Sequence, residues 1–205
     1  MGVEFIIIRL LALGIGVVFH EVAHGWVAEK LGDPTARMRG RVTLNPLVHI
    51  DPIGSVLLPM IMIFTGSPPI GWAKPVPVNF SALRNPKRDM ILVAIAGAAT
   101  NFILALIASL IMKTGLINPG SLLKLLLTQI VVINVILAVF NLVPIPPLDG
   151  SRIVMGLLPN DLAYKYMRLE RIGFFIIIIL FASGILFRVI WPVIAALLSI
   201  FGVAL

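Results

Sequence analysis

The chain reads LLALGIGVVFHEVAH from Leu10 to His24. An apolar run of this kind predicts a membrane helix. On a helix His20 and His24 are one turn apart on the same face, so both imidazoles can reach one metal ion, and zinc is the usual ion for such a pair. Glu21 points partly away from that face, where it can accept a proton from a water molecule instead of binding the metal. The stretch therefore predicts water-activating metal chemistry at membrane depth.

Composition places the whole chain in a membrane. Of the 205 residues, 60% are hydrophobic and 12% are charged, whereas a soluble domain carries about 25% charged residues. We therefore expect a multi-pass integral protein of the cell membrane, with the lipid bilayer as a partner and a single domain over residues 1–205. There is no cysteine, so a metal must take His, Asp, Glu or Asn ligands. The net charge of +7 is typical of basic cytoplasmic loops, and we expect no nucleic-acid partner.

Several segments are long and apolar enough to cross a bilayer. Met90 to Met112 and Leu125 to Leu148 contain no charged residue, and the first segment, from about Val3 to Lys30, is equally long but contains ionisable residues, which at membrane depth are usually functional. The C-terminal stretch from Ile172 to Leu205 would extend about 50 Å as one helix, against a hydrocarbon core of about 30 Å. It is expected to break into two shorter helices at one of three positions: Gly184, Arg188 or Pro192.

The segment from Pro52 to Ala73 has no charged residue but four prolines, and its clean apolar part, Val56 to Phe64, is short. Basic residues gather in the loops 30–41, 74–88 and 152–171, whereas the connection 113–121 contains only Lys113. If the three basic loops share the cytoplasmic side, residues 52–64 must enter and leave on that side, as a re-entrant hairpin or a broken helix does. A full crossing is the alternative.

Two residues are candidates for the third ligand of a catalytic zinc, which takes three protein ligands and leaves a position for water. His49 is the remaining histidine of the chain. Asp149 ends an uncharged stretch, where a lone carboxylate needs a cation as partner, and three prolines shortly before it prevent a regular helix. Asp149 could instead cap the segment that follows it. The residues favour Asp149 over His49 and leave both open.

Three motifs resemble, in order, those of the site-2 protease family of intramembrane zinc metallopeptidases. They are His20-Glu21-x-x-His24, Gly97-Ala98-Ala99-Thr100-Asn101 and Asn141-x-x-Pro144-x-Pro146-x-Leu148-Asp149-Gly150. The resemblance covers roughly residues 5 to 185. It implies one Zn²⁺ per chain with Asp149 as the third ligand, and it implies that Asn141 holds the substrate or its oxyanion. The family usually has Gly-Pro-x-x-Asn in the middle motif, so Ala98 predicts a slightly less kinked helix with intact chemistry.

The resemblance also predicts the fold class. We expect an all-α integral membrane protein of about five to six transmembrane or re-entrant helices, with a short membrane-associated β-hairpin. The hairpin is expected in the partly alternating segment from Arg37 to His49, where its edge would add a strand to the substrate; an ordinary basic loop is the alternative. His49 and its neighbours up to Pro52 would support the site or form a surface turn. The chain is similar to a minimal family member without PDZ or CBS domains.

These observations predict an intramembrane zinc metalloprotease. Its substrate would be a transmembrane protein already trimmed by another protease, as in regulated intramembrane proteolysis. In this interpretation His20, His24 and Asp149 bind zinc, and Glu21 and Asn141 are catalytic. The alternative is a membrane protein that binds or transports metal without hydrolysis, and such a protein would not need Glu21.

Overall fold

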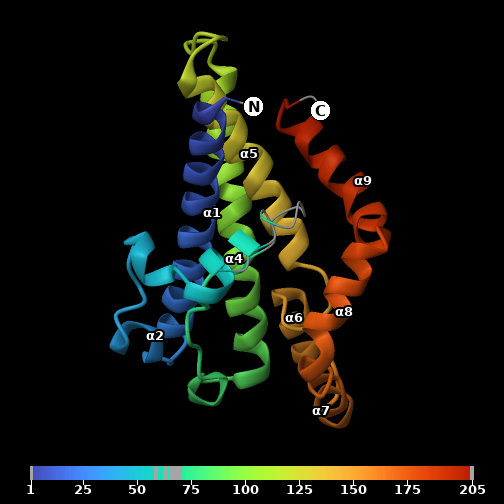
Figure 1. Cartoon of the computed structure of the whole chain (residues 1–205). Coiled ribbons are helices and arrows are strands. Elements are labelled where there is room, and N and C mark those ends of the chain that lie inside the picture. The colour runs from blue at the N-terminus through green and yellow to red at the C-terminus, as the bar shows by residue number, and fades with distance from the viewer. Residues whose placement is uncertain (1, 58–59, 62–63, 65–70, 204–205) are drawn as a thin grey trace.

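Three long helices form the centre of the computed structural model, which describes residues 2–57, 60–61, 64 and 71–203. They are α1 (Val3–Lys30), α4 (Pro86–Lys113) and α5 (Leu122–Asn141), and each is long and apolar enough to cross a membrane. They pack side by side (Figure 1). Every regular element in the described residues is helical, which confirms the all-α prediction. The three apolar helices of bilayer length are those of a membrane protein.

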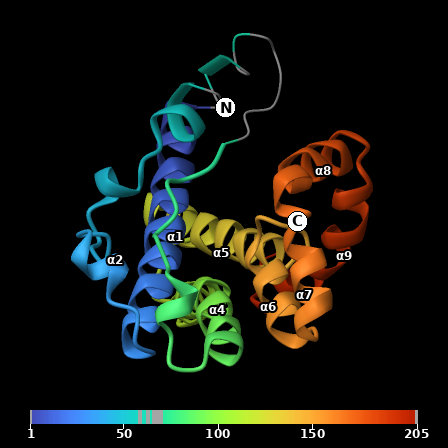
Figure 2. The same ribbon diagram turned by 90° about the horizontal axis from the view of Figure 1, so that it is seen from below.

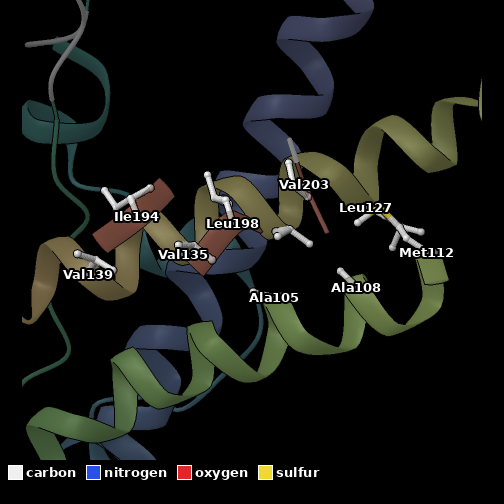
Figure 3. Packing of buried hydrophobic residues seen from close by; sticks show 10 residues of the cluster. Ala105, Ala108, Met112, Leu127, Val135, Val139, Ile194, Leu198 and Val203 are labelled. Atoms are coloured by element: carbon white, nitrogen blue, oxygen red, sulfur yellow. The ribbon is translucent and has the colours of Figure 1, made fainter. Parts of the chain in front are cut away.

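The buried core lies between α4, α5 and the last helix, α9 (Ile185–Ile200). Figure 3 shows Ala105 and Ala108 of α4 facing apolar side chains of α5. Small residues allow membrane helices to approach closely. Ile194 and Leu198 of α9 fill the remaining space and are 2% and 0% exposed. By contrast, leucines and isoleucines on the outer face of α1 are exposed, as expected for a surface that meets lipid.

The part of the chain that follows α5 forms a group of shorter helices beside this centre. They are α6 (Asp149–Leu157), α7 (Asn160–Met167), α8 (Glu170–Ala182) and α9. Seen from below, these helices lie on one side of α5, whereas α2 (Thr35–Met38) lies on the other side of α1 (Figure 2). The chain bends by 77° between α8 and α9. Gly184 stands at this break with φ of +72°, which glycine adopts at little cost, so the predicted interruption occurs there and not at Pro192.

The β-hairpin predicted between Arg37 and His49 is wrong. This segment is fully described and contains no strand; it ends α2, continues as irregular chain, and closes with the 3₁₀ helix η1 (Pro46–His49). Several of its polar groups form local hydrogen bonds. Asn45 caps η1 by accepting a hydrogen bond from the Leu47 amide, and the Arg41 amide donates to Ala36. Such local bonds compete with strand pairing.

The two ends of the proline-containing segment 52–72 lie together. The Trp72 amide donates to the Gly54 carbonyl at 3.2 Å, and the Ser55 hydroxyl donates to the Trp72 carbonyl at 2.8 Å. Residues 52–57 form a short π-helix, η2 (Pro52–Leu57). The predicted excursion itself includes residues 58–59, 62–63 and 65–70, which lie outside the described residues. The meeting of the ends is the arrangement that a re-entrant segment requires.

The three basic loops lie at one end of the helices. The Arg84 amide donates to the Leu31 carbonyl at 3.0 Å, which joins the first and second loops. The Lys87 ammonium group donates to the Leu158 carbonyl, which joins the second and third. The connection between α4 and α5 lies at the opposite end (Figure 1). This arrangement agrees with the distribution of basic residues along the sequence.

Candidate active site

Three side chains that can bind metal converge between α1 and α6. The Nε2 atoms of His20 and His24 are 3.0 Å apart, and the Asp149 Oδ2 atom lies 3.1 Å from the first and 3.2 Å from the second. Both histidines are buried. Helix periodicity brings the two imidazoles together, whereas the chain between α5 and α6 brings the carboxylate to them.

The geometry of these three atoms fits a zinc ion. Ligand atoms about 2.0–2.2 Å from a tetrahedral zinc lie roughly 3.3–3.6 Å from one another, slightly more than the three separations in this site. The Asp149 Oδ2 atom is also buried without a hydrogen-bond partner in the described part of the chain. A buried, unpartnered carboxylate oxygen is costly unless a cation satisfies it.

Both imidazoles are held with their Nε2 atoms toward the carboxylate. His24 Nδ1 lies 2.7 Å from the Val93 carbonyl oxygen, and His20 Nδ1 lies 2.7 Å from the Asn101 Oδ1 atom. Because both partners accept hydrogen bonds, each Nδ1 carries the proton and each Nε2 presents a lone pair. This is the tautomer that a metal ligand needs, and such partners fix the ring orientation as well.

Asn101 is itself held by two further groups. Its amide nitrogen donates to the Gly16 carbonyl at 3.0 Å and to the Asn134 Oδ1 atom at 2.7 Å. Asn101 and Asn134 are both completely buried. The middle motif had singled out Asn101, but sequence reasoning missed Asn134. A polar residue inside the uncharged span of α5 was the available signal, since such residues are usually functional.

Loss of the Asn101 contact should weaken zinc binding. In Asn101→Leu the His20 ring loses the acceptor that orients it, and supporting partners of this kind are worth about 10- to 100-fold in metal affinity. Zinc competition titrations on the purified protein measure the change. Ser109→Ala is the control, because Ser109 is another buried polar residue of α4 that bonds elsewhere, to Phe201. Equal affinities in both variants would contradict a supporting role for Asn101.

Gly97 of α4 provides the space that the two imidazoles occupy. A Cβ atom at this position would lie 2.5 Å from His20 Cε1 and 2.6 Å from His24 Nε2. Real contacts are never this short, so a larger residue would displace the rings. The first residue of the middle motif therefore has a direct steric role at the site, while Ala98 beside it is buried in the helix packing.

Asp149 stands at the first position of α6, directly after the proline-rich connection. Gly150 lets this turn form, because a Cβ atom there would lie 2.2 Å from the Leu142 carbonyl oxygen. A carboxylate binds metal in its ionised form, and the Asp149 carboxylate faces the two Nε2 atoms.

The two predicted catalytic residues line the same cavity as the three candidate ligands. This cavity has a volume of about 300 Å³, and its further lining consists of Pro75, Val76, Val78, Phe80, Val93, Ala94, Pro147 and Arg152. The Glu21 Oε2 atom accepts a hydrogen bond from the Val76 amide at 2.7 Å. The Asn141 amide nitrogen donates to the Leu137 carbonyl at 3.0 Å, which leaves its second hydrogen for another acceptor.

His49 lies outside this group. Its Nε2 atom lies 2.9 Å from the Thr43 carbonyl oxygen, and its own carbonyl accepts the Lys74 amide. The group of three in the described residues consists of His20, His24 and Asp149. His49 thus links Thr43 to Lys74 and does not reach the two histidines.

Comparison with known proteins identifies the family. The model of peptidase family M50 matches residues 117–182, which include Asn141 and Asp149. The chain is 36% identical over 194 residues to YwhC of Bacillus subtilis, whose name describes it as a zinc metalloprotease, and the match covers 91% of this chain and 85% of that protein. The chain belongs to peptidase family M50, the site-2 protease family. The resemblance inferred from the three motifs is thereby confirmed.

More distant relatives have similar names. This M50 chain is 30% identical to MJ0611 of Methanocaldococcus jannaschii, over 82% of this chain and 78% of that protein. It is 28% identical to Rip2 of Mycolicibacterium smegmatis, over 85% of this chain and 66% of that protein. Both are named as zinc metalloproteases. No solved structure matches the chain.

Family membership makes this chain a zinc metalloprotease with Zn²⁺ as its cofactor. It favours hydrolysis over the alternative of metal transport, which no relative named above suggests.

Proposed function

We propose that this M50 protease hydrolyses a peptide bond in or near a transmembrane helix of a membrane-protein substrate. The observation that carries the proposal is the position of the three candidate ligands inside the bundle of membrane-length helices. His20 and His24 lie roughly 15 and 9 Å along α1 from Lys30 at 1.5 Å per residue. With Lys30 at the membrane surface, both rings lie in the half of the bilayer nearer the basic loops, within reach of a cut in a spanning helix.

In this proposal His20, His24 and Asp149 hold the zinc. When bound, the zinc acts as a Lewis acid that polarises the scissile carbonyl and lowers the pKa of a water molecule toward about 7. Glu21 takes the proton of the attacking water and returns it to the leaving amine. The free amide hydrogen of Asn141 donates to the substrate or to the oxyanion that develops on its carbonyl.

The surroundings of the site favour a substrate that loses its helical structure locally. Carbonyl and amide groups inside a helix bond to one another, so a protease must first open a turn before the peptide bond is accessible. The cavity of about 300 Å³ accommodates a few residues and not a whole helix of about 10 Å diameter. A substrate already shortened by another protease would present a free end that unwinds more easily.

We further propose the membrane arrangement that goes with this reaction. The chain forms a single domain of the cell membrane over residues 1–205, with α1, α4 and α5 as spans and the loops 30–41, 74–88 and 152–171 in the cytoplasm. The support is the packing of α6 and α9 against α4 and α5 and the gathering of the basic loops at one end of the bundle.

Cleavage of a reconstituted model substrate tests the function. Purified protein in liposomes is given a labelled peptide with one apolar 20-residue helix, in two versions that differ only in a central Gly-Pro or Leu-Leu pair. We expect cleavage inside the apolar segment, faster for Gly-Pro because it opens the helix, and loss of cleavage on zinc chelation. Mass spectrometry locates the cut. Cleavage of a soluble peptide such as a casein fragment, with both membrane peptides left intact, would contradict the proposal.

A further inference from the structure

One main-chain amide holds the carboxylate of Glu21. The Val76 N–H donates to the Glu21 Oε2 atom at 2.7 Å. A carboxylate has two acceptor oxygens, so this bond occupies Oε2 and leaves Oε1 available to another donor. The position of Glu21 relative to the candidate ligands therefore depends on where the segment around Val76 lies.

The sequence around this amide makes it a rigid donor. Val76 stands between Pro75 and Pro77. Neither proline has an N–H group, so Val76 supplies the main-chain donor of the triplet. The two prolines have restricted φ angles, and Lys74 and Val76, which each precede a proline, are restricted to extended backbone. The triplet thus has few ways to move its single N–H group away from Glu21.

Arg41 holds this triplet in place from the other side. Its Nη2 atom donates to the Lys74 carbonyl at 2.6 Å and to the Pro75 carbonyl at 3.4 Å. The Lys74 amide donates in turn to the His49 carbonyl at 2.9 Å. Contacts from the segment 41–49 therefore hold both residues before Val76, which are Lys74 and Pro75.

Arg41 is unusual among the basic residues of the chain because only 8% of it is exposed. In the described residues Arg37 and Arg152 form ion pairs with Glu29 and Glu170, whereas Arg41 donates to carbonyl oxygens. A buried cation carries a large desolvation cost unless its N–H groups are bonded. The mechanism above makes no use of this charge, so its placement beside the Glu21 donor needs another explanation.

We propose that Arg41 is a positioning residue for the catalytic base. It fixes Lys74 and Pro75, and the Val76 N–H then orients the Glu21 carboxylate with Oε1 free for proton transfer. The inference rests on the proposed role of Glu21, and it adds a residue from a loop that none of the three motifs includes.

The expected signature is a loss of turnover without a loss of zinc or of substrate binding. A misplacement of about 1 Å can cost roughly 100-fold in rate. Arg41→Gln is therefore expected to lower kcat by about 10- to 100-fold with KM changed by less than about twofold. Arg41→Lys retains one donor and the charge and should recover part of this loss. Arg39→Gln removes an exposed arginine from the same loop and should leave kcat unchanged.

A double-mutant cycle with Glu21→Asp separates positioning from general stability. The aspartate is one methylene shorter and can no longer reach both the Val76 amide and the water. If Arg41 acts through Glu21, Arg41→Gln lowers kcat in the wild type but by less than about twofold in the Glu21→Asp background. The assay uses the Gly-Pro membrane peptide, with zinc content and thermal unfolding measured for each variant.

Several results would overturn the inference. One is an equal loss of kcat in both backgrounds, and another is an Arg41→Gln variant as active as Arg39→Gln. Loss of zinc in a folded Arg41→Gln protein would also place the residue in metal binding instead. If Arg41→Gln does not fold, Pro77→Ala carries the same cycle, because it loosens the Val76 donor; here too a loss that persists with Glu21→Asp contradicts the proposal. Full activity of Glu21→Gln would instead overturn the proposed function.

Discussion

Glu21→Gln should lower the rate of peptide cleavage by about 10²-fold or more, the scale of general acid–base catalysis. The glutamine side chain has nearly the size of glutamate but cannot take a proton from water. Its amide oxygen can still accept the Val76 N–H that Glu21 Oε2 now accepts. The cavity and the nearby chain should therefore keep their arrangement, and zinc should stay bound because Glu21 is not among the three candidate ligands.

The measurement compares kcat and zinc content of wild type and Glu21→Gln on the Gly-Pro membrane peptide. Glu29→Gln is the matched control, because it makes the same chemical change two turns along α1, where the carboxylate pairs with Arg37 outside the cavity. We expect the control to cleave at the wild-type rate. Undiminished cleavage by Glu21→Gln would reject Glu21 as the base.

Asp149→Ala should abolish stoichiometric zinc binding. The variant removes one of three converging ligands, so the loss should exceed the roughly 10- to 100-fold that supporting partners contribute to metal affinity. The two histidines remain, with their Nε2 atoms 3.0 Å apart, but a neutral pair binds zinc far more weakly than a pair with a carboxylate. Zinc should also stop stabilising the fold, since a ligand raises the unfolding temperature only when it binds the folded state.

Elemental analysis and thermal unfolding with and without added zinc measure these effects. His49→Ala is the decisive comparison, because the sequence left His49 as the other candidate ligand. In the structure His49 contacts the Thr43 carbonyl, so His49→Ala should retain one zinc per chain. A zinc-free His49→Ala together with a zinc-loaded Asp149→Ala would reverse the ligand assignment.

Local patterns determined much of this protein from the sequence alone. The membrane-length helices α1, α4 and α5 follow from long, mostly apolar runs of bilayer length, because burying such runs in lipid is strongly favourable. The pairing of His20 with His24 follows from the helical period, which acts over a single turn. The break near Gly184 follows from the backbone freedom of one glycine. Three ordered motifs were sufficient to predict the protease family and its zinc.

The tertiary structure decided which distant groups meet at the site. Asp149 and His49 were both acceptable ligands by residue type, and the turn at Gly150 together with the packing of α6 on α4 brings Asp149 to the histidines. Asn134 and the Val76 amide had no local pattern that tied them to His20 or Glu21. The expected hairpin failed for the same reason: caps and long-range bonds, such as that from Arg41 to Lys74, satisfy this segment better than strand pairing. Contacts between distant residues depend on how the helices pack in three dimensions. No single segment of the sequence contains a pattern that specifies this packing.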